Sequence, residues 1–322
     1  MPIWLQLTAA VSAGAASALM GAAFVPFMKK QRFCEEETPQ NGDEVVRSAL
    51  LPTMGGLLAV FGCLLGFVMA YVLYRTVFVI DYTAVSVQQN TKELLLAIGY
   101  ALFWALLGMY ADICIIRRRP LKRQPMPLRI AFVYIVTLLF LMLCATQQTV
   151  LDFGFFRYDA GILSIPLTAA MGTAVFLLTQ ANGEKTDGMS ISVSGVLLLG
   201  MAVLFMQEGN ELHALLALAA AGACMGCFVW NLHPARCRIG RTGMLWLGAV
   251  VTAICLISHL HMAVLLTAAV YLLDRIPCLG KNKKTLQEQL RQADMKPWQN
   301  IAVFAGFAAF CMAIAVMLYA AF

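Results

Sequence analysis

Long apolar runs separated by short polar segments set the pattern of the whole chain. A helix of about 20 apolar residues spans the hydrocarbon core of a bilayer, so these runs predict ten transmembrane helices. The first is read as a retained helix, because no convincing charged leader precedes its apolar run. The predicted helices cover residues 3–28, 51–74, 93–113, 128–148, 161–180, 190–207, 211–231, 243–258, 260–275 and 299–321.

Basic residues fall almost entirely on one side of this pattern. Only Arg75, Lys92 and Arg157 lie in the loops or helix ends of one face, while the other 20 of the 23 Lys and Arg residues lie on the opposite face. By the positive-inside rule the basic face is cytoplasmic, which places both termini outside. The cytoplasmic loops are then 29–50, 114–127, 181–189, 232–242 and 276–298, and residues 1–322 form a single ten-helix transmembrane domain.

Composition agrees with an all-α integral membrane protein. The 322 residues are 61% hydrophobic and 12% charged, with a mean hydropathy of +0.78. Soluble domains carry about twice that charged fraction, and we expect no nucleic-acid partner. Cys224 and Cys227 form a CxxC, but they lie inside a predicted helix without neighbouring ligands, so packing is the favoured interpretation. His259 and His261 are interpreted as outer-loop residues. Residues 281–296 fit a short amphipathic helix or a solvated linker equally well.

Four short motifs occur on the predicted cytoplasmic face. They are LPTMGG at 51–56, GMYAD at 108–112, TDGMS at 186–190 and NLHPARCRIGRTGMLWLG at 231–248. In this order, the chain resembles the polyprenyl-phosphate phosphosugar transferases, and among them the phospho-N-acetylmuramoyl-pentapeptide transferase family. That family has TPTMGG, GxxDD, NLTDGLDG and NxHPAxxxxGDTGSLxLG in these places. The retained motif residues include Pro52, Thr53, Gly55 and Gly56.

The resemblance implies a specific reaction at the inner leaflet of a bacterial-type cytoplasmic membrane. A membrane-embedded polyprenyl phosphate attacks the β-phosphate of a UDP-sugar and releases UMP. Phosphoryl transfer of this kind uses Mg²⁺, which prefers carboxylate and other oxygen ligands. The resemblance also implies a homodimer.

Several family positions that carry this chemistry differ in this chain. Asp112 and Asp187 are retained, but the first aspartate of the GxxDD pair becomes Ala111 and the second aspartate of NLTDGLDG becomes Ser190. The metal-binding aspartate of the last motif becomes Arg241. The uracil-stacking aromatic residue becomes Arg238, whereas Asn231 and His233 are kept. The family's histidine cluster before the last helix is absent, since residues 276–298 contain no histidine.

The arginine at position 241 argues against the usual magnesium site. A guanidinium about 4 Å from Mg²⁺ is repelled by about 8 kcal/mol at an effective dielectric near 20. A cationic surface containing Arg117, Arg238 and Arg241 suits phosphate without a metal, because arginine binds phosphate oxygens bidentately. Asn231 and His233 are further candidates for phosphate binding. The plainer interpretation also stands: Arg241 is an ordinary positive-inside arginine, Asp112 and Asp187 are ion-pair partners, and Asn231 and His233 are helix-end residues.

Two functional readings follow. The favoured one is a catalytically degenerate relative, a pseudoenzyme that binds a polyprenyl phosphate, another anionic lipid or a partner protein. The second is an active phosphosugar transferase in which Asp112, Asp187 and Glu184 hold a metal, or arginines replace it. A transporter is a weaker third reading, because the sequence shows no inverted repeat and little charge inside the predicted helices.

Overall fold

The computed structural model describes residues 3–30, 34–35, 51–77, 85–117, 124–144, 149–182, 188–232, 235–279, 285–293 and 295–321. Within these ranges, nine helices are long and apolar enough to cross a membrane. They are α1 (Ile3–Lys30), α2 (Gly56–Val77), α3 (Val85–Ile116), α4 (Met126–Cys144), α5 (Ser164–Asn182), α6 (Met189–Gln207), α7 (Glu211–Asn231), α8 (Gly240–Ile257) and α11 (Pro297–Ala321). The chain is therefore an all-α, multi-pass membrane protein, as predicted.

The remaining elements are short. The ninth predicted span is α9 (His261–Leu273), whose 13 residues reach only about 20 Å and so do not cross the hydrocarbon core alone. The predicted surface helix is partly confirmed by α10 (Leu286–Gln292). Two antiparallel pairs join β1 (Cys34–Glu35) to β2 (Leu51–Pro52) and β3 (Val150–Asp152) to β4 (Arg157–Asp159). Single 3₁₀ turns are η1 (Gly161–Leu163) and η2 (Ile276–Leu279).

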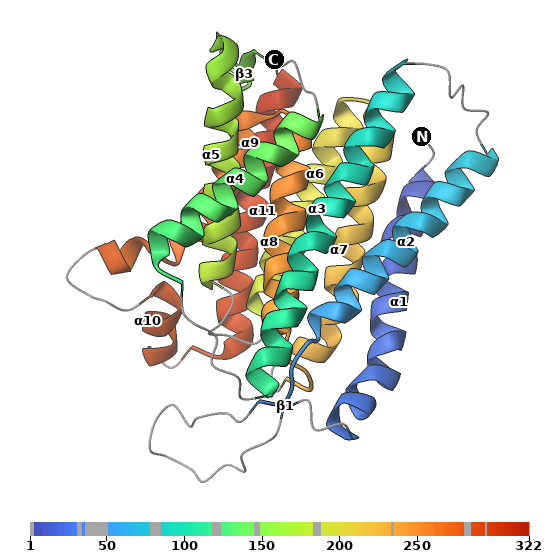
Figure 1. Cartoon of the computed structure of the whole chain (residues 1–322), viewed down its shortest axis with the longest axis vertical. Helices are drawn as coiled ribbons and strands as arrows, with labels where there is room; N and C mark the ends of the chain where they lie inside the picture. Colours follow the sequence, from blue (N-terminus) through green and yellow to red (C-terminus); the bar gives the residue numbers. More distant parts are fainter. Residues whose placement is uncertain are drawn as a thin grey trace.

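Helices α7 and α8 form the centre of the bundle (Figure 1). In each, 83% of the most apolar stretch is buried inside the protein, against 28% in α1 and α4, which face lipid. The interior of α7 is rich in alanine and glycine, which lets its backbone approach that of α1. A Cβ atom on Gly222 would lie 2.1 Å from the carbonyl oxygen of Ala10. Small residues therefore set the spacing of the first and seventh helices.

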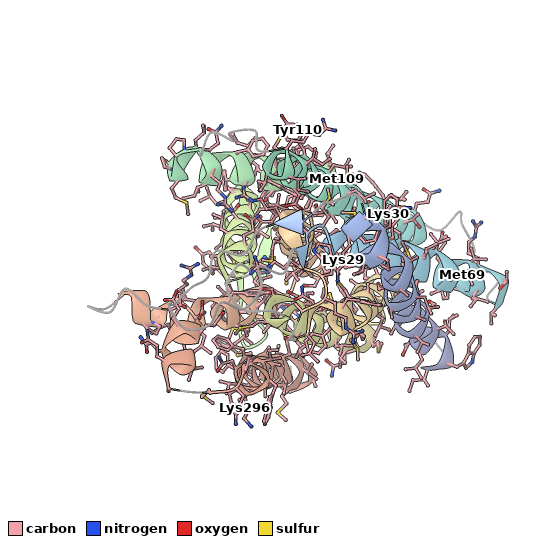
Figure 2. The ribbon with its side chains drawn as sticks, turned by 90° about the horizontal axis from the view of Figure 1, so that it is seen from below. Lys29, Lys30, Met69, Met109, Tyr110 and Lys296 are labelled. Atoms are coloured by element: carbon pink, nitrogen blue, oxygen red, sulfur yellow. The ribbon has the colours of Figure 1, made fainter. Side chains whose placement is uncertain are left out.

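Both termini lie at one end of the bundle, which we call the terminal end (Figure 1). At the opposite end α3 and α7 finish, α2 and α8 begin, and β1 and α10 lie; we call this the motif end. Viewed from below, the molecule shows Lys29 and Lys30 on one side of the motif end and Lys296 on another (Figure 2). All three lysines therefore lie at the motif end, where the sequence predicts the basic face.

The structure corrects several boundaries. Helix α2 begins at Gly56 rather than at residue 51, because Leu51–Pro52 pairs with Cys34–Glu35 as a short strand. Residues 75–92, predicted as a loop, largely continue α2 and begin α3. The outer loop at 149–160 contains the β3–β4 hairpin. Its strands are only three residues long, too short to be predicted from an alternating sequence pattern.

His261 is the clearest wrong prediction. It begins α9 and is only 3% exposed. Its ring Nδ1 accepts the backbone N–H of Asp152 at 3.1 Å, and its Nε2 lies 3.1 Å from the hydroxyl of Thr168. The ring thus joins the β3–β4 hairpin to α5 and α9 and is not a free loop side chain.

Candidate functional site

The Pro52–Gly56 motif is paired with the segment that leads into α8. The backbone N–H of Arg238 donates to the carbonyl of Pro52 at 2.9 Å. The N–H groups of Gly55 and Gly56 donate to the carbonyls of Arg238 and Ile239, each at 2.8 Å. Two motifs that are about 180 residues apart in the chain therefore share one hydrogen-bonded layer at the motif end.

Glycines let three helices meet at this layer. A Cβ atom on Gly56 would lie 2.1 Å from the Cα of Gly243, and one on Gly108 would lie 2.6 Å from the Cα of Thr242. Neither contact leaves room for a side chain, so the starts of α2 and α8 and the end of α3 touch through their backbones. These motif glycines are required by packing.

Asp112 caps the beginning of α8 from the end of α3. Its carboxylate accepts the backbone N–H groups of Arg241 and Thr242, each at 2.9 Å, and the Thr242 hydroxyl at 2.6 Å. The side chain is 3% exposed. A carboxylate beside the first N–H groups of a helix satisfies donors that have no partner within the helix and also interacts favourably with the helix dipole. The three hydrogen bonds of Asp112 are therefore accounted for by its role as the cap of α8.

Gly240 makes this cap possible. It has a φ of 69°, the left-handed region that favours glycine. A Cβ atom at this position would lie 2.8 Å from a carboxylate oxygen of Asp112 and 2.8 Å from the backbone nitrogen of Met54. Any larger residue would push the carboxylate away from the helix it caps.

The arginines lie around the cap. Arg241 directly follows Gly240, and its backbone N–H binds Asp112 while its side chain is exposed. Arg238 is half-buried and Arg117, the last described residue after α3, is exposed. The structure therefore brings Arg238 and Arg241 to the layer that contains Asp112, and it places Arg117 just beyond the end of the helix that carries Asp112.

Asn231 fastens the end of α7 to two neighbouring segments. It is 5% exposed, its side-chain N–H donates to the carbonyl of Cys237 at 2.9 Å, and its side-chain oxygen accepts the N–H of Gly188. The predicted phosphate ligand thus holds the loops together. His233 and Asp187, the two other predicted site residues, lie outside the described residues, as does Glu184.

Within the described ranges, two buried hydroxyls at the motif end have no hydrogen-bond partner. Thr53 lies in the Pro52–Gly56 motif and is 4% exposed, and Ser190 lies in the first turn of α6 and is 6% exposed. Buried polar groups are nearly always paired in folded proteins, so these two hydroxyls are exceptions within the described part of the chain. Ser190 is the residue that replaces the family's second aspartate.

The described residues at the motif end do not fit a magnesium ion. Throughout the part of the chain that the structure describes, no group of three or more His, Cys, Asp or Glu side chains is placed to hold a metal. Asp112 already accepts three hydrogen bonds. The family's metal-ligand position, whose backbone N–H contacts Asp112, is occupied by Arg241. Magnesium needs several hard oxygen ligands in near-octahedral geometry. The described side chains supply one carboxylate, Asp112, which is already hydrogen-bonded to α8 and lies next to Arg241.

Sequence reasoning missed the partner of Asp112. Thr242 supplies two of the three donors to the carboxylate, through its backbone and its hydroxyl. Part of the signal was present, since a Thr just before an apolar run is typical of a helix beginning. Nothing local to the sequence, however, shows that the matching carboxylate is supplied by another helix.

Comparison with known proteins identifies the family of the chain. The model of glycosyl transferase family 4 matches residues 94–259, which is more than half of the chain and includes α7, α8 and the Asp112 cap. The chain belongs to glycosyl transferase family 4.

Three bacterial proteins match most of the chain. It is 25% identical over 289 residues to the phospho-N-acetylmuramoyl-pentapeptide-transferase of Shouchella clausii, covering 86% of this chain and 82% of that protein. It is 26% identical over 268 residues to the protein of the same name from Clostridioides difficile, covering 81% and 77%. The match to the Clostridium beijerinckii protein of that name is 25% over 272 residues, covering 81% and 76%. The chain is similar to these bacterial proteins along nearly its whole length.

Proposed function

We propose that this family 4 protein is a catalytically degenerate relative of the phospho-N-acetylmuramoyl-pentapeptide transferases, which binds a polyprenyl phosphate at the motif end without turning over a UDP-sugar. One observation carries the proposal. The retained carboxylate, Asp112, accepts three hydrogen bonds as the cap of α8, while the neighbouring family ligand position is Arg241. Of the two retained carboxylates, the one that the structure describes holds the fold, and the family ligand position beside it has become a cation.

The pattern of retained and replaced motif residues supports this reading. Gly56, Asp112 and Asn231 are retained, and each has a packing or hydrogen-bonding role in the described structure. The replaced positions are 111, 190, 238 and 241, where the family resemblance implies metal, nucleotide or catalytic roles. Among the motif positions that the structure describes, residues that maintain the scaffold are kept and residues that the resemblance assigns to the reaction are replaced; Asp187 and His233, which are also retained, lie outside the described residues. A protein that needs its shape but not the transfer reaction accounts for both groups.

A phosphate monoester is the ligand that these side chains suit. Arg238 and Arg241 supply guanidinium groups, which bind phosphate oxygens in pairs, and opening of the motif end around a ligand would add the hydroxyls of Thr53 and Ser190, which are buried without a partner among the described residues. A site of cations and hydroxyls needs no metal to neutralise the phosphate. The polyprenyl chain would lie in the bilayer beside the bundle. A partner protein at the same basic surface is the other ligand class, and a homodimer remains part of the proposal by family resemblance.

An active transferase with an altered site is the second candidate. It rests on Asp187 and Glu184, which lie outside the described residues, acting together with Asp112 on a metal. The three donors to Asp112 weigh against it, because a carboxylate that caps a helix must give up part of that bonding before it can bind Mg²⁺. No reaction step through a metal follows from the described residues.

A transfer assay separates the two candidates. The purified chain in nanodiscs containing undecaprenyl phosphate is supplied with UDP-N-acetylmuramoyl-pentapeptide, with and without Mg²⁺, and release of UMP is followed. We expect no release above protein-free nanodiscs. Sustained Mg²⁺-dependent release would overturn the degenerate reading.

Binding is measured on the same preparations. Undecaprenyl phosphate retained by the protein is counted by native mass spectrometry for the wild type and for Arg241→Gln, with Arg157→Gln at the terminal end as the matched control. Loss of one charge-assisted phosphate contact predicts at least tenfold weaker retention in Arg241→Gln and no change in the control. Equal retention in all three would remove the lipid-phosphate part of the proposal. The double variant Ala111→Asp, Arg241→Asp then tests whether restoring two carboxylates restores Mg²⁺-dependent UMP release.

A further inference from the structure

A second site lies at the terminal end, away from the motifs. A groove of about 550 Å³ opens between the end of α2 and the beginning of α3. Its lining combines basic, polar and apolar side chains from the two helices: Tyr71, Arg75, Gln88, Thr91, Lys92, Leu95 and Leu96. Nothing in the proposed function at the motif end uses these residues.

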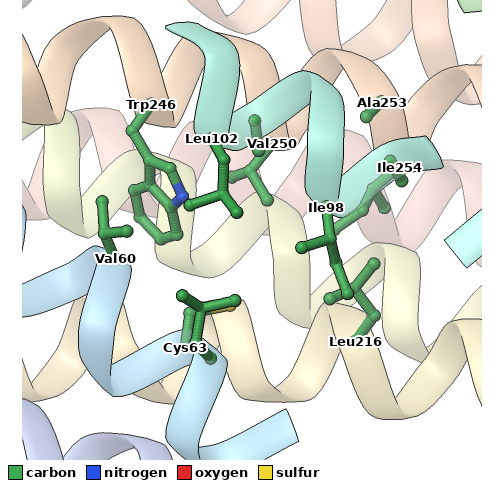
Figure 3. Close-up of a pocket in the computed structure, with 12 residues that line it drawn as sticks. Val60, Cys63, Ile98, Leu102, Leu216, Trp246, Val250, Ala253 and Ile254 are labelled. Carbon is green, nitrogen blue, oxygen red and sulfur yellow. The ribbon is translucent and has the colours of Figure 1, made fainter. Parts of the chain in front are cut away.

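The groove exists because consecutive helices diverge. Helix α2 packs mainly against α1 and α7, whereas α3 packs mainly against α8, so the two separate toward the terminal end (Figure 1). Deeper in the bundle, Val60 and Cys63 of α2 face Ile98 and Leu102 of α3 across a cavity of only about 20 Å³ (Figure 3). That is room for about one water molecule, and its lining is apolar. The two helices are therefore nearly closed against each other at that level, and the larger opening between them lies nearer the terminal end.

Positive charge is concentrated in this groove against the general trend of the chain. The predicted outer face has only three basic residues, and two of them, Arg75 and Lys92, line the groove. None of the described residues that line it is acidic. The guanidinium of Arg75 lies 5.9 Å from the centre of the Tyr71 ring, a cation–π contact that positions the charge at the groove. Two cations within one polar groove, which Thr91 and Gln88 also line, match a phosphate group.

Apolar surface continues from the charged part toward the membrane interior. Leu95 is 65% exposed and Val72 is 50% exposed, and both face the surroundings of the bundle. A Cβ atom on Gly99, one turn beyond Leu95, would meet nothing within 4 Å, so this part of α3 is exposed and has open space for an acyl chain. A charged head over an apolar strip is the shape of a phospholipid at the bilayer boundary, with the phosphate among the cations and one acyl chain along α3.

We propose that the groove between α2 and α3 binds one anionic phospholipid of the outer leaflet, with its phosphate at Arg75 and Lys92 and an acyl chain along Leu95 and Gly99. The lipid fills the space that the two diverging helices leave and joins them at the terminal end. This site is separate from the motif end and takes its ligand from the other leaflet.

Competition between lipids tests the proposal. The full chain is titrated with phosphatidylglycerol or phosphatidylcholine of identical acyl chains, and bound lipid is counted by native mass spectrometry. The wild type is expected to prefer phosphatidylglycerol. Removing one surface charge weakens anionic-lipid binding by about fivefold. Arg75→Gln and Lys92→Gln should therefore each bind phosphatidylglycerol about fivefold more weakly, and the double variant about 25-fold more weakly. Phosphatidylcholine binding should not change.

Arg157→Gln is the matched control, because it removes the third basic residue of the same face from outside the groove. Thermal unfolding of each variant shows that the fold is kept. Two added ligands separate the sources of phosphate: glycerol phosphate has the head without chains, and undecaprenyl phosphate has a different chain. The proposal predicts that neither displaces phosphatidylglycerol at equal concentration. Displacement by either one, or equal phosphatidylglycerol binding by the wild type and the double variant, would overturn it.

Discussion

Replacing Asp112 by asparagine separates a structural from a catalytic role at the motif end. The substitution keeps the size of the side chain and one acceptor oxygen, but it puts an amide group where the second carboxylate oxygen was. If the amide nitrogen replaces the oxygen that accepts the N–H and the hydroxyl of Thr242, at 2.9 and 2.6 Å, its N–H groups face those donors; in the other orientation they face the backbone N–H of Arg241. The first turn of α8 loses its negative partner.

The expected loss of stability follows from these contacts. A hydrogen bond to a charged group contributes about 1.5–3 kcal/mol. The favourable interaction between a carboxylate and a helix N-terminus adds about 0.3–2 kcal/mol. The Thr242 hydroxyl can rotate and accept from the new amide, which recovers one contact, and removal of a buried charge recovers some desolvation. We therefore expect Asp112→Asn to lower the free energy of unfolding by about 2–4 kcal/mol, a fall of about 5 °C in Tm for a chain of this length.

Hydrogen exchange locates the effect. In nanodiscs, the amides of Arg241 and Thr242 should exchange faster in Asp112→Asn than in the wild type, while the middle of α8 stays protected. Asp159→Asn is the control, because Asp159 is exposed and accepts only the N–H of Gly161 at 3.0 Å among its described contacts. Unchanged exchange and an unchanged Tm in Asp112→Asn would refute the capping role and return Asp112 to the list of candidate catalysts.

Three further outcomes are expected. Thr242→Val removes one donor to the same carboxylate and should lower the free energy of unfolding by about 1.5–3 kcal/mol in a denaturant series; no loss would show that this contact is unimportant. Gly56→Ala should lower it by about 3 kcal/mol because its Cβ would overlap Gly243, whereas Gly99→Ala, with open space around it, should raise Tm slightly through helix propensity; the reverse order would contradict the packing described. Burial lowers the pKa of His259 to about 4 from its usual 6.5, so the unfolded chain binds more protons between these values and stability should fall by about 2 kcal/mol from pH 7 to pH 5. His259→Asn, which tolerates the φ of 59°, should remove this contribution in a pH series of thermal melts, and identical slopes for the two proteins would contradict it.

The long helices were predictable because membrane burial imposes length and composition on every span. The convergence of the motifs was predictable as well, and the short distance from Asp112 to the backbone of Arg241, 2.9 Å, agrees with it. The role of Asp112 was not predictable, since its partners lie 129 and 130 residues away and depend on how α3 crosses α8.

The polar pair Glu93 and His213 was missed for a similar reason. Their side chains lie 3.3 Å apart and are 8% and 2% exposed, inside helices that the apolar pattern marks only as spans. An acidic residue in such a helix signals a buried partner, but the sequence does not say which one. The length of the apolar runs indicates which segments enter the membrane. Which polar side chains pair inside the bundle depends on contacts between helices, and these are seen only in the folded structure.

Binding of Mn²⁺, a paramagnetic substitute for Mg²⁺, tests the central claim most directly. Titration of the wild type in nanodiscs, followed by electron paramagnetic resonance, reports free and bound metal without requiring turnover. A site with one capped carboxylate beside Arg241 predicts no saturable binding below millimolar concentration, and it predicts that Ala111→Asp with Arg241→Asp creates such binding. Saturable micromolar binding by the wild type that disappears in Asp112→Asn would contradict the account.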